Sequence, residues 1–99
     1  MKYSLYTPEE ALTNLSQRAR TLRLTKRWKR STLAQRSGVT PSSLRRFEQT
    51  GEVSMKNFLK IVFALGRLDE TENLLLIPDA QSISDLERNE KKIPERGSI

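Results

Sequence analysis

Apolar residues recur along the first part of the chain at spacings of three and four, the pattern of a helix that buries one face. The segment Thr7-Pro8-Glu9-Glu10 precedes them and has the residues of a capping box, with proline at the first helical position. We therefore expect a long helix from Pro8 to about Lys26. Its expected inward stripe consists of Ala11, Leu12, Leu15, Ala19 and Leu22.

Four shorter apolar segments follow, each bounded by a residue type that starts or ends helices. They predict helices over residues 30–37, 41–50 and 55–65, the last two capped by Thr40 and Ser54, and a fifth from the Asp69-x-x-Glu72 capping pattern up to Pro78. Gly38, Gly51 and Gly66 stand where the first three of these should end. Their expected inward residues are Leu33, Ala34, Leu44, Phe47, Phe58, Leu59, Val62 and Leu65.

No alternating strand pattern and no internal repeat interrupts this series, so the sequence predicts an all-α fold. We expect one compact five-helix domain over residues 1–78. Apolar residues become sparse after Pro78, and we expect residues 79–99 to form a polar, flexible tail. No apolar run approaches the roughly 20 residues that cross a bilayer, so we expect no membrane partner. The absence of cysteine fits a reducing compartment, and we expect the protein to be cytoplasmic.

Composition narrows the chemistry that the chain can perform. Cysteine and histidine are both absent, which removes thiolates, the commonest general base and the commonest transition-metal ligands. We therefore expect no enzymatic activity, no metal and no cofactor. Charge is divided along the chain: residues 1–67 hold 14 Lys/Arg and 4 Asp/Glu, whereas residues 68–99 hold 4 and 8. A basic body indicates a polyanionic partner, although charge alone is also compatible with plain solubility.

The stretch RSTLAQRSGVTPSSLRRFEQTG, residues 30–51, has the spacing of two short helices joined by a tight turn. Ala34 provides the small residue that the first helix needs where the second crosses it. Gly38 accepts the positive φ that the turn requires, at little steric cost. Leu44 gives the second helix an apolar inner face, so its outer face is available to enter a groove.

These residues resemble the Xre-type, or phage-repressor-like, helix-turn-helix family. The resemblance extends over roughly residues 12–76 and is carried by Leu33-Ala34, Ser37-Gly38-Val39-Thr40, Ser43-Leu44, Phe47-Glu48, Gly51 and the segment Phe58–Gly66. It implies a repressor-like domain that binds double-stranded DNA with its third helix in the major groove. It also implies a homodimer on a palindromic operator, because one domain reads few base pairs.

On this resemblance Ser42, Ser43, Arg45 and Arg46 are the expected base-reading residues. An arginine here can bond O6 and N7 of guanine together. The alternative, that Arg45 and Arg46 are solvated surface charges, stays open. Pro41 departs from relatives that carry a base-reading polar side chain at that position. The expected DNA-backbone contacts are Arg30, Ser31, Thr40, Ser54, Lys56 and Asn57.

Other positions are expected to be structural. The resemblance implies that Glu48 pairs with Arg23 and so sets the angle of the third helix. Arg30 stands where the family usually has glutamine, which favours a phosphate contact. Trp28 is expected to fill the space between the first two helices, and Phe47 to lie in the core. The residues with an expected structural role are therefore Arg23, Ala34, Gly38, Leu44 and Glu48.

The fifth helix has more apolar residues than so small a helix needs, which makes Leu68, Leu74, Leu75 and Ile77 dimer candidates. Ordinary core closure is the alternative. The segments 46–54 and 58–68 also resemble HipB-type antitoxins, which repress their own operon and bind a HipA-like kinase toxin. The sequence therefore predicts a DNA-binding autorepressor and antitoxin. A stand-alone or phage-derived regulator and a helical adaptor without DNA activity remain open.

Overall fold

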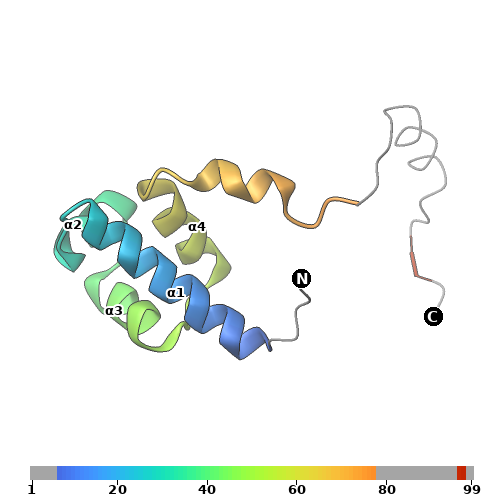
Figure 1. Cartoon of the computed structure of the whole chain (residues 1–99), viewed down its shortest axis with the longest axis horizontal. Helices are drawn as coiled ribbons and strands as arrows, with labels where there is room; N and C mark the ends of the chain where they lie inside the picture. The colour runs from blue at the N-terminus through green and yellow to red at the C-terminus, as the bar shows by residue number, and fades with distance from the viewer. Residues whose placement is uncertain (1–6, 78–95, 98–99) are drawn as a thin grey trace.

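A computed structural model describes residues 7–77 and 96–97, and all regular structure in these ranges is helical (Figure 1). Its elements are α1 (Pro8–Thr25), α2 (Arg30–Ser37), α3 (Pro41–Thr50), α4 (Met55–Ala64) and a 3₁₀ helix, η1 (Leu68–Asn73). This confirms the predicted all-α fold. None of the helices in these ranges combines the length and the apolar character needed to cross a bilayer. The expected flexible tail lies almost entirely outside the described residues.

Side chains fix three of the four α-helix starts, as the sequence predicts. Thr7 and Glu10 form the full capping box of α1, with Glu10 N donating to Thr7 Oγ1 (3.1 Å) and Thr7 N donating to Glu10 Oε1 (2.9 Å). Thr40 caps α3 and Ser54 caps α4, each accepting a hydrogen bond from the third residue of its helix. α2 begins after Lys29 without a side-chain cap.

Two glycines end α2 and α3 in the left-handed backbone conformation that disfavours other residues. Gly38 has φ 76° and Gly51 has φ 84°. The two positions differ in their surroundings. A Cβ atom at Gly38 would meet nothing within 4 Å, whereas one at Gly51 would lie 3.0 Å from Leu12 Cβ and 3.1 Å from its carbonyl group. Glycine is therefore needed at position 51 for two reasons: the turn requires a positive φ, and α1 approaches too closely to leave room for a Cβ atom.

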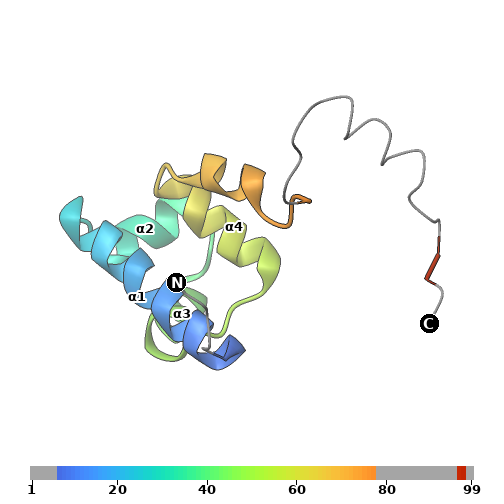
Figure 2. The same ribbon diagram turned by 45° about the vertical axis from the view of Figure 1, so that its right-hand side comes forward.

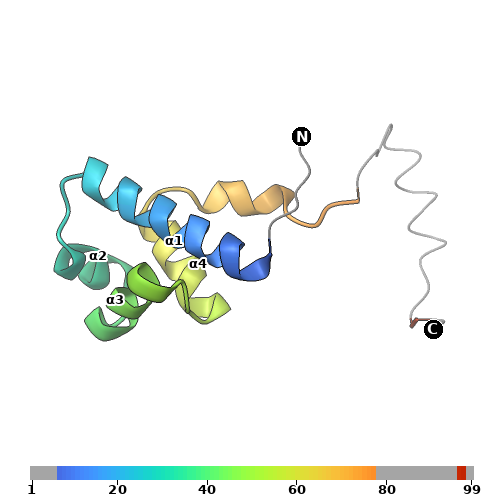
Figure 3. The same ribbon diagram turned by 60° about the horizontal axis from the view of Figure 1, so that its bottom comes forward.

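The helices enclose one small core. α1 packs against α3, α2 packs against both α3 and α4, and η1 packs against α4. Figure 1 places α3 and η1 on opposite sides of the helical domain, with α1 crossing between them, and Figures 2 and 3 also show α3 and η1 apart. The fully enclosed apolar side chains are Ala19, Leu33, Ala34, Val39, Leu44, Phe47, Ile61 and Leu65.

The inner face of α1 differs from the predicted stripe. Leu12 and Leu15 are each 39% exposed, whereas Ser16 and Arg23 are buried beside Ala19. Both polar residues are satisfied internally: Ser16 Oγ donates to Thr13 O (3.0 Å), and Arg23 Nε donates to a carboxylate of α3. Ser16, Ala19 and Arg23 therefore form the centre of the buried face of α1. Leu12 lies on the same face near the helix start, beside Gly51, and Leu15 lies at its edge.

The predicted fifth helix is wrong in type and extent. η1 is a six-residue 3₁₀ helix without a side-chain cap, and it ends before Leu74. Leu75 has φ 63°, and Leu74, Leu75, Leu76 and Ile77 are all more than half exposed. In a 3₁₀ helix, side chains three positions apart eclipse one another, so such helices are usually short. The apolar residues 74–77 therefore do not continue η1.

Candidate nucleic-acid interface

The face of α3 that the sequence assigns to base reading is exposed. Ser42, Arg45 and Arg46 are exposed and Ser43 is half-buried, whereas Leu44 is fully enclosed together with Phe47. Side chains on one helix thus divide cleanly between the core and the surface. The apolar side holds α3 against the domain, and the polar side leaves two guanidinium groups and two hydroxyls accessible to a ligand.

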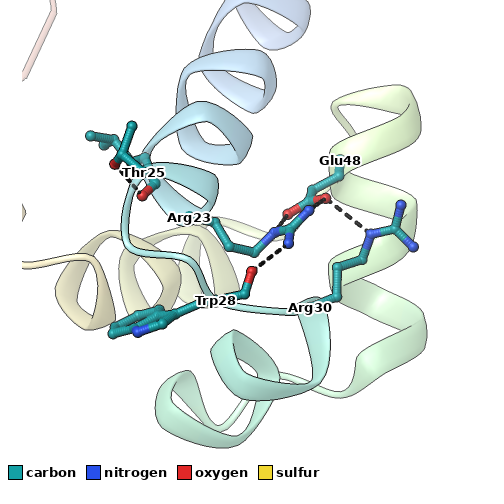
Figure 4. Close-up of polar contacts among 6 residues, drawn as sticks. Arg23, Thr25, Trp28, Arg30 and Glu48 are labelled. Atoms are coloured by element: carbon teal, nitrogen blue, oxygen red, sulfur yellow. Dashed lines mark hydrogen bonds and ion pairs between the residues drawn. The ribbon is translucent and has the colours of Figure 1, made fainter.

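A buried ion pair joins α3 to α1 (Figure 4). Arg23 Nε donates to Glu48 Oε2 (2.7 Å) and Arg23 Nη2 donates to Glu48 Oε1 (3.0 Å), a two-bond fork. Arg23 is 6% exposed and Glu48 is 4% exposed. The structure thus contains the pair that the family resemblance implies, and it removes the carboxylate of Glu48 from the exposed face of α3.

Arg30 is a third member of this cluster, which sequence reasoning missed. Its Nε donates to Glu48 Oε1 (3.0 Å), and its side chain remains 42% exposed (Figure 4). Arg23 also donates from Nη1 to Trp28 O (2.8 Å), which ties the α1–α2 connection to the same centre. One carboxylate therefore orients α1, α2 and α3 together. Arg30 remains a candidate phosphate contact, because its side chain is partly exposed while Glu48 holds its guanidinium near the start of α2.

Hydroxyl groups at the start of α3 are partly committed to the helix itself. Thr40 Oγ1 accepts from Ser43 N (3.2 Å) and donates to Ser43 Oγ (2.9 Å). Because the hydroxyl hydrogen of Thr40 points at Ser43, the free hydroxyl donor of this pair belongs to Ser43. Ser42 Oγ lies 3.4 Å from Thr40 Oγ1 and is exposed. Ser42 and Ser43 can therefore present hydrogen-bond donors, whereas Thr40 mainly shapes the helix start.

The start of α4 adjoins α3 across a shallow hollow, which brings Ser43 and Arg46 together with Ser54 and Asn57. The hollow is lined by Ser43, Arg46, Glu52, Val53, Ser54 and Asn57. Ser54 Oγ accepts from Asn57 N (3.1 Å), and Lys56 is exposed on the same turn. Ser31, at the start of α2, is exposed as well. An anion at this hollow would meet groups from both helices.

Arg46 has a partner that the sequence analysis missed. Its Nε donates to Glu52 Oε1 (3.0 Å), and its Nη2 also donates to that oxygen. The two side chains are 68% and 57% exposed, so the pair lies on the surface. Residues six apart do not face each other on one helix, and the contact exists because Gly51 ends α3 and reverses the chain.

Charges at the helix starts differ between α1 and the other α-helices. α1 has Glu9 and Glu10 in its first turn, which offset the positive end of its dipole. α2, α3 and α4 have no acidic residue there. Apart from the amides that bond to Thr40 and Ser54, their first turns have no acidic side chain to compete with an anion such as a phosphate group.

Trp28 lies half-buried against the core, with cations over its ring. Lys26 Nζ is 5.3 Å and the Arg36 guanidinium carbon 4.6 Å from the ring centroid. The predicted filling role fits the packed side of the indole. The indole also makes cation–π contacts with these two basic side chains.

The dimer candidates Leu68, Leu74, Leu75 and Ile77 lie on or after η1, away from α3 in all three ribbon views. All four are exposed, and Leu75 is 99% exposed. They do not form the face of a helix, because η1 ends before Leu74. Leu74 also borders a groove between α1 and α4 that is mainly apolar and includes Leu15, Leu22, Phe58 and Val62.

Within residues 7–77, no group of three or more acidic side chains is placed to hold a metal ion. Comparisons of the chain with protein-family models, with curated proteins and with solved structures found no match.

Proposed function

We propose that this protein is a sequence-specific transcriptional repressor that binds double-stranded DNA as a homodimer. The observation that carries the proposal is the division of α3: Leu44 and Phe47 anchor it, while Ser42, Arg45 and Arg46 project from its exposed side. The dimensions of an α-helix suit the DNA major groove, where each base pair presents a distinct pattern of donors and acceptors. The excess of basic residues over residues 1–67 favours binding to the phosphate backbone.

Base preference is tested by replacing Arg46 with alanine. We expect Arg46→Ala to weaken binding to the preferred duplex by about 1–3 kcal/mol and to relax preference at one position of each half-site. The preferred duplex comes from selection among random duplexes with the wild-type protein at physiological salt. Binding is then measured by titration against that duplex and its single-position variants.

Lys56→Ala is the matched control, because it removes the same charge from an exposed residue beside the interface. We expect it to weaken binding to all sequences and to reduce the slope of log affinity against log salt by about 0.9 for each phosphate that Lys56 neutralises. A preference profile unchanged by Arg46→Ala would contradict the base-reading role of this residue. A wild-type chain that binds no duplex would leave the helical adaptor as the better explanation.

Self-association is tested at Leu75, which is fully exposed and makes no core contact. Two half-sites are read only if two copies bind together, and exposed apolar residues after η1 are the proposed contact. We expect Leu75→Lys to keep the helical circular dichroism spectrum of wild type, because the residue packs against nothing in the domain. Sedimentation should show a shift from dimer to monomer, and an unchanged dimer would contradict this placement.

The narrower part of the proposal is that the protein is the antitoxin of a HipA-like kinase toxin and represses its own operon. It rests on the resemblance of residues 46–54 and 58–68 to HipB-type antitoxins. Co-expression with a kinase encoded next to it, followed by co-purification, tests this role. Specific binding to the chain's own upstream DNA without any kinase partner would favour the stand-alone regulator.

A further inference from the structure

The backbone around Gly51 holds Glu52 beside α3. Gly51 turns the chain back, and Glu52 N donates to Thr50 Oγ1 (3.1 Å). Thr50 Oγ1 in turn donates to Arg46 O (2.8 Å). The threonine hydroxyl thus connects the backbone of Glu52 to the backbone of Arg46. The local backbone therefore fixes the position from which the Glu52 carboxylate reaches Arg46.

The Arg46–Glu52 contact uses one edge of the guanidinium. An arginine has five N–H donors in a rigid plane. Glu52 Oε1 takes the Nε donor and one Nη2 donor, which point along the same edge. The end of the group, with Nη1 and the second Nη2 hydrogen, is left to form a two-donor fork. A fork of this kind can bond the O6 and N7 acceptors of one guanine.

We propose that Glu52 is a positioning residue that determines how Arg46 reads DNA, an inference that rests on the DNA binding proposed above. Glu52 holds the guanidinium plane in one orientation and leaves its second pair of donors free. It therefore reduces the conformational entropy that Arg46 loses on meeting a base. It also neutralises the charge of Arg46, which weakens contacts to phosphate that carry no sequence information.

Both effects act on selectivity and hardly on folding. The two side chains are mostly exposed, and ion pairs of this kind add little to stability. A bare Arg46 would reach bases and phosphates alike. With Glu52 in place, the correct base meets two donors of Arg46 that are already oriented for it. On an incorrect sequence, the neutralised charge of Arg46 adds little attraction to the phosphates. Such penalties against wrong partners are a common source of specificity.

The test is Glu52→Gln, compared with wild type on three duplexes: the one selected by the wild-type protein, one altered at the position that depends on Arg46, and a scrambled one. We expect discrimination at the altered position to fall at least about fivefold, the lower end of what one bidentate contact provides. Affinity for the scrambled duplex should rise, and the salt slope should steepen by up to about 0.9 per half-site. In an Arg46→Ala background, Glu52→Gln should change discrimination no further.

Glu70→Gln is the matched control, because Glu70 forms an exposed ion pair with Arg67 at the start of η1. This substitution changes the net charge by the same amount as Glu52→Gln. It should leave discrimination unchanged. Full discrimination by Glu52→Gln, or an equal loss in Glu70→Gln, would overturn the positioning role while leaving the proposed repressor intact. A wild-type protein without preference among the three duplexes would instead overturn the proposed function itself.

Discussion

Replacing Glu48 by glutamine is expected to lower the free energy of unfolding by about 3–5 kcal/mol, the cost of breaking a buried ion pair. The side chain keeps its size but loses the charge that balances Arg23. Arg23 is 6% exposed and would stay buried without its ionic partner. Small domains have only about 5–15 kcal/mol of stability in total, so a large share is lost. Urea unfolding followed by circular dichroism measures the effect.

The matched control for this experiment is Glu52→Gln, which makes the same chemical change in an exposed pair and should cost less than about 1 kcal/mol. A double variant, Arg23→Met with Glu48→Leu, removes both buried charges and should recover much of the stability, since apolar pairs often replace buried ion pairs well. A Glu48→Gln protein that unfolds at the wild-type urea concentration would show that the cluster contributes no stability.

Gly51→Ala is expected to destabilise the domain by about 2–5 kcal/mol. A left-handed backbone costs a residue with a Cβ roughly 1–2 kcal/mol, and overpacking adds about 1–3 kcal/mol. The new methyl group would lie 3.0 Å from Leu12 Cβ and 3.1 Å from the Leu12 carbonyl group. Because the neighbour is helix backbone as well as side chain, α1 or α3 has to move. Thermal unfolding should show a melting temperature lower by more than about 8 °C.

Gly38→Ala separates the two contributions. Gly38 has nearly the same backbone conformation, φ 76°, but nothing lies within 4 Å of a Cβ built on it. We expect this variant to lose only the conformational part, about 1–2 kcal/mol. Equal melting temperatures for the two variants would mean that α1 accommodates the methyl group at Gly51 without cost. The comparison therefore measures the close approach of α1 and α3 directly.

Local chemistry explains why the helix boundaries were predictable. Thr7, Thr40 and Ser54 act through hydrogen bonds to residues three positions away, and Gly38 and Gly51 act through their own backbone angles. Such signals need no knowledge of the rest of the fold. The exposed and buried sides of α3 followed from helical periodicity in the same way.

The errors arose where the outcome depends on packing. Leu12 and Leu15 are only partly covered, whereas Arg23 is buried because it pairs with Glu48, a residue 25 positions away. Ile61 is fully buried although the predicted stripe of α4 omitted it. The Asp69-x-x-Glu72 pattern predicted a helix start, but η1 has no side-chain cap and too few inward partners to continue.

The candidate site was predictable as a set of residues but not as a set of contacts. Exposure of Ser42, Arg45 and Arg46 followed from their positions on the helix. The pairs Arg30–Glu48 and Arg46–Glu52 did not, because each connects residues from different elements or across a chain reversal. Their geometry depends on the angle between α2 and α3 and on the turn at Gly51, which spacing alone does not specify.

The separation of surface from core on α3 has an evolutionary consequence. Ser42, Arg45, Arg46 and Gln49 are all exposed, so exchanging them leaves the packing of Leu44 and Phe47 untouched. Surface substitutions of this kind usually change stability by less than about 0.5 kcal/mol. Under the DNA-binding function proposed above, a few codon changes at these positions would alter the nucleotide target of the protein while the packing of the domain stays the same.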